Sequence, residues 1–299
     1  MEDNIKSPMA ETRKHILDTL DKAQEILTLP SVIQRILEVT SSKNSSVAEL
    51  KDIIESDPAL TTRILSVANS AYYGFVRKVS TISHAVVVLG FEEIKNIALG
   101  MSVLKLFDRK GSVFMERLWR HSLAVAVATR MVASHLGLKL EGKYFVGGLL
   151  HDIGKIFLYQ YMPEVYGVLL TQMLDNDNVY TYHRLETLIC GVSHGEIGGR
   201  LLNSWGFPPD ITDAVKYHHL PGLVVTDKVF AICIHLADIL CSIKGITPLD
   251  DHFFLPVDRD ILDDLYFLKE DFSTDDMVFL LERLDLEIER HSSFVTMFR

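Results

Sequence analysis

Residues 147–155 read Gly-Gly-Leu-Leu-His-Asp-Ile-Gly-Lys, and they lie in an apolar-periodic segment that predicts a helix from Lys143 to Met162. The adjacent pair His151-Asp152 is the central chemical signal of the chain. Neighbouring residues of a helix point about 100° apart, so both side chains can reach one metal ion or two adjacent ions. Lys155 follows Asp152 by three residues and shares its face, where it can contact a phosphate oxygen or a metal-bound water.

Side chains of the metal-binding kind recur on other predicted helices. These further candidates are His121, His194, the doublet His218-His219, and Asp238. Imidazole and carboxylate together suit Fe, Mn, Ni, Co or Zn better than Ca or Mg alone. With His151 and Asp152 the set holds five histidines and two aspartates, too many for one tetrahedral zinc ion. The sequence therefore predicts a site for two divalent transition-metal ions.

A single histidine on a helix is more often a packed or surface residue than a ligand, and the other seven histidines are interpreted in this way. They are His15, His84, His135, His183, His235, His252 and His291. His235 lies one turn before Asp238 and is assigned to the surroundings of the site or to the core. A buried polar network without metal is the competing interpretation. It is disfavoured because burying so many unpaired imidazoles and carboxylates costs free energy.

Helical periodicity dominates the rest of the chain as well. Ser46 to Glu49 reads as a capping box, Asp57-Pro58 is a second helix start, and Gly74 is placed to end that second helix. The run Val86 to Val88 could be a strand, but it is short and its setting is helical. Further helices are expected at about 83–89, 92–106, 114–136, 163–174, 182–205, 209–218, 228–244 and within 259–298. We therefore expect an all-α fold.

The polar, Gly-containing segment Asp108 to Ser112 separates two apolar-periodic regions and is the best internal boundary. We expect two packed helical bundles, with residues 1–110 as an N-terminal subdomain and 111–299 as a metal-binding subdomain with acidic C-terminal helices. The helix pair within Val47 to Ala68 could be a DNA-reading motif. A packed helical hairpin is favoured instead, because the second helix lacks a basic exposed face.

Composition excludes several function classes. The chain has 299 residues and a net charge of −10, and acids outnumber bases between Asp250 and Glu289. Such a segment repels a phosphate backbone, so broad nucleic-acid binding is not expected. The N-terminus has no apolar signal-peptide segment, and no run approaches the ~18 apolar residues of a membrane span. Three scattered cysteines, Cys190, Cys233 and Cys241, are typical of reduced buried thiols, so we expect a cytoplasmic protein without membrane association.

The motifs resemble known families. The residues that follow the ordered H…HD…D pattern of the HD superfamily are His121, His151, Asp152 and Asp238. The residues similar to the extra ligands of its HD-GYP branch are His194, His218 and His219. The segments that look like the HDOD domain, the HD-related output domain of bacterial signalling proteins, are Leu29-Pro30 and residues 57–65, 69–74 and 85–90. This similarity runs from about Leu27 to His219, and it implies a helical, cytoplasmic bacterial regulator.

Two departures from these families matter. HDOD domains typically look degenerate at the metal positions, whereas this chain keeps all of them, which favours metal binding. In the HD-GYP branch a Glu and a Gly-Tyr-Pro loop follow the histidine doublet, but here the residues are Leu220-Pro221-Gly222-Leu223, which argues against cyclic di-GMP as substrate. Arg117 lies one turn before His121 where an acid would be needed, which argues against a third metal.

Two functions remain open at this point. The first is a metal-dependent phosphohydrolase or phosphodiesterase that cleaves a phosphate-containing small molecule, with Lys155 neutralising charge on the phosphoryl oxygens. Arg120 is a candidate substrate clamp. The expected ligands of the first ion are His121, His151, Asp152 and Asp238. Those of the second are His194, His218 and His219, with Asp152 as the bridge. The alternative is a non-catalytic signalling module that binds a protein partner or small ligand and holds structural or sensory metals.

Overall fold

The computed structural model describes residues 8–26, 31–41, 46–69, 78–106, 112–140, 142–173, 175, 180–248 and 259–290. Within these ranges every regular element is a helix, so the prediction of an all-α fold is confirmed. The first helices are α1 (Pro8–Ile26), α2 (Ser31–Ser41), α3 (Val47–Glu55), α4 (Pro58–Ala68), α5 (Ile82–Leu89) and α6 (Phe91–Leu106). None of the described helices combines the length and apolarity that a bilayer span requires.

The second half of the chain supplies the remaining elements. Those before the histidine doublet are α7 (Val113–His135), α8 (Lys143–Leu150), α9 (Ile153–Tyr161), α10 (Pro163–Met173), α11 (Tyr182–Cys190), α12 (His194–Ser204) and α13 (Pro209–Lys216). Those after it are the short 3-10 helix η1 (Pro221–Leu223), α14 (Lys228–Ile243), α15 (Arg259–Leu268) and α16 (Thr274–Arg290).

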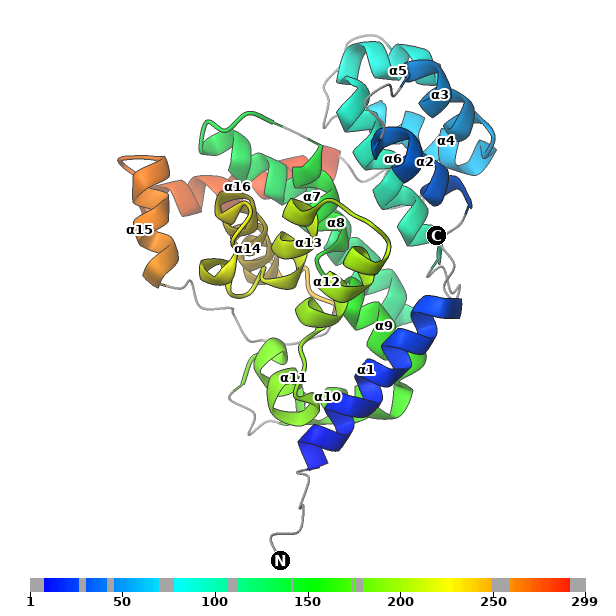
Figure 1. The fold of residues 1–299 in the computed structure, drawn as a ribbon. Helices are drawn as coiled ribbons and strands as arrows, with labels where there is room; N and C mark the ends of the chain where they lie inside the picture. Colours follow the sequence, from blue (N-terminus) through cyan, green and yellow to red (C-terminus); the bar gives the residue numbers. More distant parts are fainter. Residues whose placement is uncertain are drawn as a thin grey trace, which may run out of the picture.

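Helices α2 to α6 pack on one another as a compact bundle at one end of the molecule (Figure 1). Both predicted helix starts are confirmed, since Ser46 and Glu49 form a reciprocal capping box and Asp57 caps α4. The helix that Asp57 begins ends earlier than expected, at Ala68. After the helix has ended, the Asn69 side chain donates to the Val79 carbonyl and accepts from the Val79 N–H, so it binds the segment before α5. The expected helix end, Gly74, lies outside the described residues. Val86 to Val88 are helical, in α5.

Two predicted helices prove to be pairs of helices. The expected helix over residues 143–162 is broken at His151 and Asp152, between α8 and α9. The His151 ring donates from Nδ1 to the Gly148 carbonyl at 2.7 Å, which is the acceptor that a continuous helix offers to the Asp152 N–H. The expected helix over residues 182–205 is broken after Cys190, where Gly191 adopts a left-handed conformation with φ of 66°. Ser193 then caps α12.

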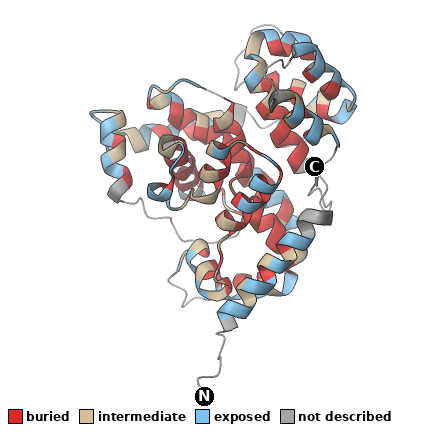
Figure 2. Ribbon diagram, in the orientation of Figure 1, coloured by how far each residue is buried: buried red, intermediate tan, exposed pale blue. Residues whose placement is uncertain are grey.

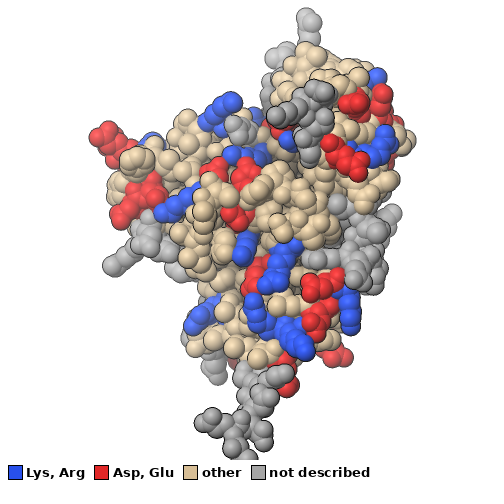
Figure 3. All heavy atoms as spheres, viewed as in Figure 1, with Lys and Arg blue, Asp and Glu red and all other residues tan. Residues whose placement is uncertain are grey.

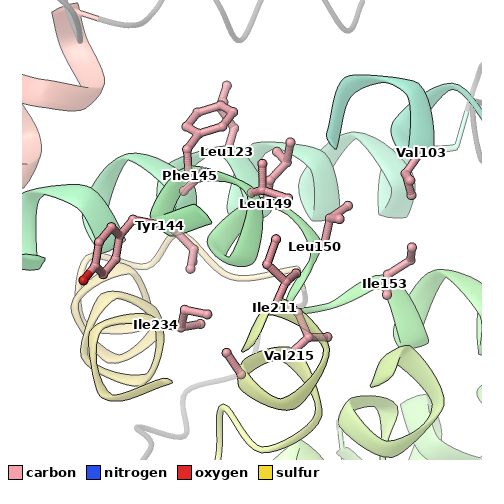
Figure 4. Packing of buried hydrophobic residues seen from close by; sticks show 14 of the residues in the cluster. Val103, Leu123, Tyr144, Phe145, Leu149, Leu150, Ile153, Ile211, Val215 and Ile234 are labelled. Atoms are coloured by element: carbon pink, nitrogen blue, oxygen red, sulfur yellow. The ribbon is translucent and has the colours of Figure 1, made fainter. Parts of the chain in front are cut away.

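The core of the second bundle forms around α7, which packs against α8 and α14 (Figure 2). Nearly the whole of α7 from Met115 to Ala133 is buried, so this helix lies inside the protein rather than on its surface. Figure 4 shows Ile211 and Val215 of α13 and Ile234 of α14 pointing toward the α8 side chains. Helix α6 contacts α8 and joins the two bundles.

Helix α1 contacts α11 and α12, although these helices come from the second half of the chain (Figure 1). Arg13 of α1 binds the Glu196 carboxylate of α12 at 2.8 Å and donates to the Gly191 carbonyl in the turn between α11 and α12. The first helix therefore supports the turn that precedes His194. The division of the chain near residue 110 stays a prediction, since residues 107–111 lie outside the described ranges.

Candidate metal centre

The structure brings the seven predicted ligand residues together from five separate parts of the chain. His121 comes from α7, His151 and Asp152 from the turn between α8 and α9, and Asp238 from α14. His194 opens α12, and His218-His219 follows α13. Two clusters of ligand atoms result, each within 4.8 Å, and we name them the first group (His121, His151, Asp238) and the second group (His194, His218, His219). His151, Asp152 and His218 form a third such cluster that joins the two groups.

Two glycines allow the helices to approach closely enough for this convergence. A Cβ on Gly154, in α9, would lie 2.0 Å from the carbonyl oxygen of His194. A Cβ on Gly195, in α12, would lie 2.6 Å from the carbonyl oxygen of Lys216. Contacts this short exclude any larger residue without a shift of the backbone. Helix α12 is therefore in direct main-chain contact with the elements that carry Asp152 and the histidine doublet.

The first group brings two imidazole nitrogens into close contact. Nδ1 of His121 donates to the Ile246 carbonyl at 2.7 Å, and Nδ1 of His151 donates to the Gly148 carbonyl at 2.7 Å. Each neutral ring therefore has only a lone pair at Nε2. These two Nε2 atoms lie 3.2 Å apart, so two neutral rings would repel each other. Burial by itself would lower the pKa of His121, but the contact of its Nε2 with Asp238 at 3.3 Å raises this pKa, so a proton on His121 relieves the repulsion when no metal ion is bound. Nitrogens bound to one metal ion at about 2.0–2.1 Å are separated by about this distance.

The second group is equally compact. Nε2 of His194 lies 3.2 Å from Nε2 of His218 and 3.1 Å from Nε2 of His219. The His218 ring is fixed from behind, because its Nδ1 donates to the Val215 carbonyl at 2.7 Å. His219 also faces the first group, with Nδ1 3.9 Å from an oxygen of Asp238.

The two carboxylate oxygens of Asp152 face the two groups separately. Oδ2 lies 3.5 Å from Nε2 of His121 and 3.4 Å from Nε2 of His151. Oδ1 lies 3.2 Å from Nε2 of His194, yet it is buried and makes no hydrogen bond to any described residue. A buried carboxylate oxygen without a donor is unfavourable unless a cation is bound. The position fits the bridging role expected from the sequence.

Burial and the local charges set the ionisation of the site. Burial lowers the pKa of His151 and His194, and it lowers that of His218 to about 3, so these rings are neutral at pH 7. Burial by itself would raise the pKa of Asp152, but its interactions with His151 and with the Lys155 ammonium hold this pKa well below its usual range. Neutral imidazoles and an ionised carboxylate are the forms that bind metal ions.

Lys155 is buried beside the centre and contacts Asp152. Its ammonium donates to Oδ2 of Asp152 at 2.8 Å and lies 5.1 Å from the centroid of the Tyr182 ring. Burial would lower the pKa of Lys155, but the Asp152 charge raises it above the ordinary value, so the side chain carries its charge at neutral pH. Arg120, the candidate clamp, is exposed on α7 while its neighbour His121 is buried. The structure therefore supplies Lys155, not Arg120, as the cation next to the centre.

One important residue was missed by the sequence interpretation. Glu186 of α11 is fully buried, and its Oε2 accepts from the His194 backbone N–H at 2.8 Å and lies 2.5 Å from Nδ1 of the same ring. Burial raises the pKa of Glu186 well above its usual range. A carboxyl behind a ligating histidine fixes the orientation of the ring and increases its affinity for the metal. Eight residues and a helix break separate Glu186 from His194, so no spacing rule pointed to it.

Two histidines that the sequence interpretation did not count as ligands also lie close to the centre. The ring of His183 lies 4.8 Å from that of His219, measured between centroids, and burial lowers the pKa of His183 to about 4. Nδ1 of His235 donates to the His218 carbonyl at 2.8 Å, so His235 holds the backbone of the doublet in place. The prediction placed His235 next to the site or in the core, and the contact agrees with it.

The centre opens to a cavity of about 30 Å³ whose walls include Lys155, His183, His219 and Asp238. A buried water needs about 10–15 Å³, so this cavity holds a few waters or the tip of a larger molecule. Tyr182 and His183, at the start of α11, form part of the wall of this cavity.

Comparisons with known proteins identify the family and the fold of this chain. The family model of the HDOD domain matches residues 26–221. An HDOD domain protein of unknown function from Geobacter sulfurreducens is 24% identical with a TM-score of 0.73, over 96% of this chain and 99% of that one. A candidate phosphohydrolase from Shewanella amazonensis SB2B is 23% identical with a TM-score of 0.71, over 95% of this chain and 98% of that one. These two likenesses support the fold.

An uncharacterized protein of Treponema pallidum (strain Nichols) is 25% identical over 210 residues, which are 70% of this chain. The chain spans only 40% of the length of this curated relative.

Proposed function

This chain belongs to the HDOD domain family, and we propose that its histidine–aspartate centre binds two divalent transition-metal ions and hydrolyses a phosphate ester. The ions are of the Fe, Mn, Ni, Co or Zn class, since the donors are imidazole nitrogens and carboxylate oxygens. The first group and Asp152 hold one ion, and the second group holds the other. Asp152 bridges them, because its two oxygens face the two groups.

The observation that carries this proposal is the contact between His121 and His151. Both rings use Nδ1 to donate to main-chain carbonyls, so their Nε2 atoms face each other at 3.2 Å inside the protein, where two unprotonated nitrogens would repel each other. Both histidines are buried, with exposed fractions of 1% and 0%, so water does not separate them. A bound cation turns this repulsion into coordination.

Ions of this class lower the pKa of a bound water and polarise phosphoryl oxygens. Residues of the chain stabilise the charge that develops during the reaction. Lys155 keeps a positive charge at the cavity wall, where it would stabilise negative charge that develops on the phosphoryl oxygens. Burial of the surrounding side chains lowers the local dielectric constant, which strengthens that interaction. Asp152, which Lys155 contacts, stays ionised.

The test combines metal analysis with turnover. Elemental analysis of the purified protein should find about two transition-metal ions per chain, and His151→Ala and Asp152→Ala should lose them. The wild type, supplied with Mn²⁺ or Fe²⁺, is then screened against phosphate monoesters, phosphodiesters and nucleotides. Turnover that Asp152→Ala abolishes supports the hydrolase. Absence of metal from the wild type, or unchanged metal in both variants, contradicts the proposal.

A second function is favoured by one observation, the small volume of the cavity at the centre. A space of about 30 Å³ does not admit a whole phosphate ester without movement of the α11 segment. In this alternative the metals are structural or sensory, and the protein is a signalling module that binds a partner protein. Metal binding without turnover across the substrate panel would favour it.

A further inference from the structure

A larger groove lies directly outside the metal centre. It has a volume of about 640 Å³ and runs between α11, the turn before α12 and the end of α13. Its wall shares Thr181, His183 and His219 with the small cavity at the centre. A molecule bound in the groove would therefore contact His219, one of the proposed metal ligands, and the wall of the small cavity. The volume lies in the range typical of small-molecule sites, about 300–1,000 Å³.

The charges that line this groove are mainly positive. Arg184 of α11 and Lys216 of α13 are on its wall, and neither forms an ion pair with any described residue. Lys216 lies over the Tyr217 ring, with its ammonium 4.6 Å from the centroid. Figure 3 shows several Lys and Arg side chains, with Asp and Glu side chains among them, over the part of the surface formed by α1, α11 and α12.

The acidic residue of the groove is already neutralised. Glu196 lies on the wall, but its carboxylate accepts from Arg13 at 2.8 Å and from Arg200 at 3.2 Å. The charges of Arg184 and Lys216 are therefore not cancelled within the groove. In a chain with a net charge of −10, a local excess of positive charge next to a metal centre favours an anionic ligand.

We infer that this groove binds the leaving group of the substrate, and that this leaving group is polar and carries a second negative charge besides the reacting phosphate. The ligand class is that of small phosphate esters with a further phosphate or carboxylate, such as bisphosphates and nucleotides. Arg184 and Lys216 bind the second anion while the reacting phosphate lies at the metal centre. This inference rests on the proposed function for the position of the reacting phosphate, but the binding preference can be measured without turnover.

The probes are two phosphonates that differ by one charge, benzylphosphonate and 4-carboxybenzylphosphonate. Their carbon–phosphorus bond is not hydrolysed, so calorimetry on the Mn²⁺-loaded full chain measures binding alone. We expect the carboxylated probe to bind about 5-fold more tightly to the wild type, the value of one exposed charge pair. Arg184→Gln and Lys216→Gln should each reduce this preference. Arg283→Gln, the same change on α16 outside the groove, should leave it unaltered.

Equal binding of the two probes by the wild type, binding of neither probe, or a preference that survives in both groove variants would overturn the inference. Hydrolysis of phenyl phosphate and 4-carboxyphenyl phosphate is measured in parallel. If the carboxylated probe binds more tightly but neither ester is hydrolysed, the proposed catalysis is contradicted and anion binding in the groove is supported. If both esters are hydrolysed but the probes bind without any charge preference, the proposed catalysis is supported and anion binding in the groove is contradicted.

Discussion

The two histidine groups differ in how one of their rings is held in position. In the first group, His121 and His151 are fixed by hydrogen bonds to the main-chain carbonyls of Ile246 and Gly148. In the second group, His218 is fixed in the same way by the Val215 carbonyl, but His194 is fixed by the side chain of Glu186. A hydrogen bond to a main-chain carbonyl persists after most substitutions, whereas a hydrogen bond to a side-chain carboxyl is lost when that one residue is substituted. The second group should therefore be the more easily disrupted half of the centre.

The largest effect is expected at Asp152, because its two carboxylate oxygens face one group each. Asp152→Asn removes the negative charge that both ions would share, so metal affinity should fall more than about 100-fold at both positions. Asp238→Asn should reduce only the ion of the first group. Elemental analysis after dialysis, together with titration of one metal at a time, measures the two losses. If both variants lose the same amount of metal, Asp152 does not serve both ions while Asp238 serves one.

A second large effect is expected at Gly154, where the added methyl would meet the His194 carbonyl at 2.0 Å. Gly154→Ala should push α12 away from α9, at a cost of about 1–3 kcal/mol in unfolding free energy, and should weaken metal binding by the second group first.

Gly167→Ala is the matched control for this change. Gly167 lies in α10 with open space around its Cα, so alanine there should be neutral or stabilising by up to about 1 kcal/mol. Denaturant unfolding measures both variants. A Gly154→Ala protein as stable as the Gly167→Ala control, with full metal content, would show that the close approach of α12 to α9 is not needed.

Much of the centre could be predicted from the sequence, because the ligands themselves carry the signal. The pair His151-Asp152 and the doublet His218-His219 are recognisable as residue types in sequence, and the structure places them together. The orientation of the pair was not predictable in the same way. It depends on a helix break at residues 151–152, a position with no Pro, in a segment whose apolar period continues across the break.

The other helix break carried a signal that could have been used. Gly191 followed by Ser193 is the combination of a left-handed helix end and a new N-cap, and it marks the boundary between α11 and α12. Glu186 had no such signal. Its role arises only from packing, since α11 folds back and brings its carboxyl to the start of α12.

A smaller and more selective effect is expected at Glu186. Glu186→Gln keeps the size of the side chain but removes the carboxyl behind His194, so the affinity of the second group should fall about 10- to 100-fold. The first group should keep its metal. Stepwise metal titration, followed by absorption with Co²⁺ as probe, separates the two sites. Loss of both ions to the same extent would mean that the variant disturbs the whole centre rather than one ring.

The smallest effect is expected at Arg13, which supports the second group from outside. Arg13→Gln removes the ion pair with Glu196 and the hydrogen bond to the Gly191 carbonyl, so α1 should be held less firmly against α11 and α12. The pair is partly exposed, and its loss should cost no more than about 1 kcal/mol of stability. Metal affinity of the second group should drop only a few-fold, less than in Glu186→Gln. A loss as large as that of Glu186→Gln would mean that α1 determines the position of His194, and the second group would then depend on a helix that lies before the matched HDOD domain.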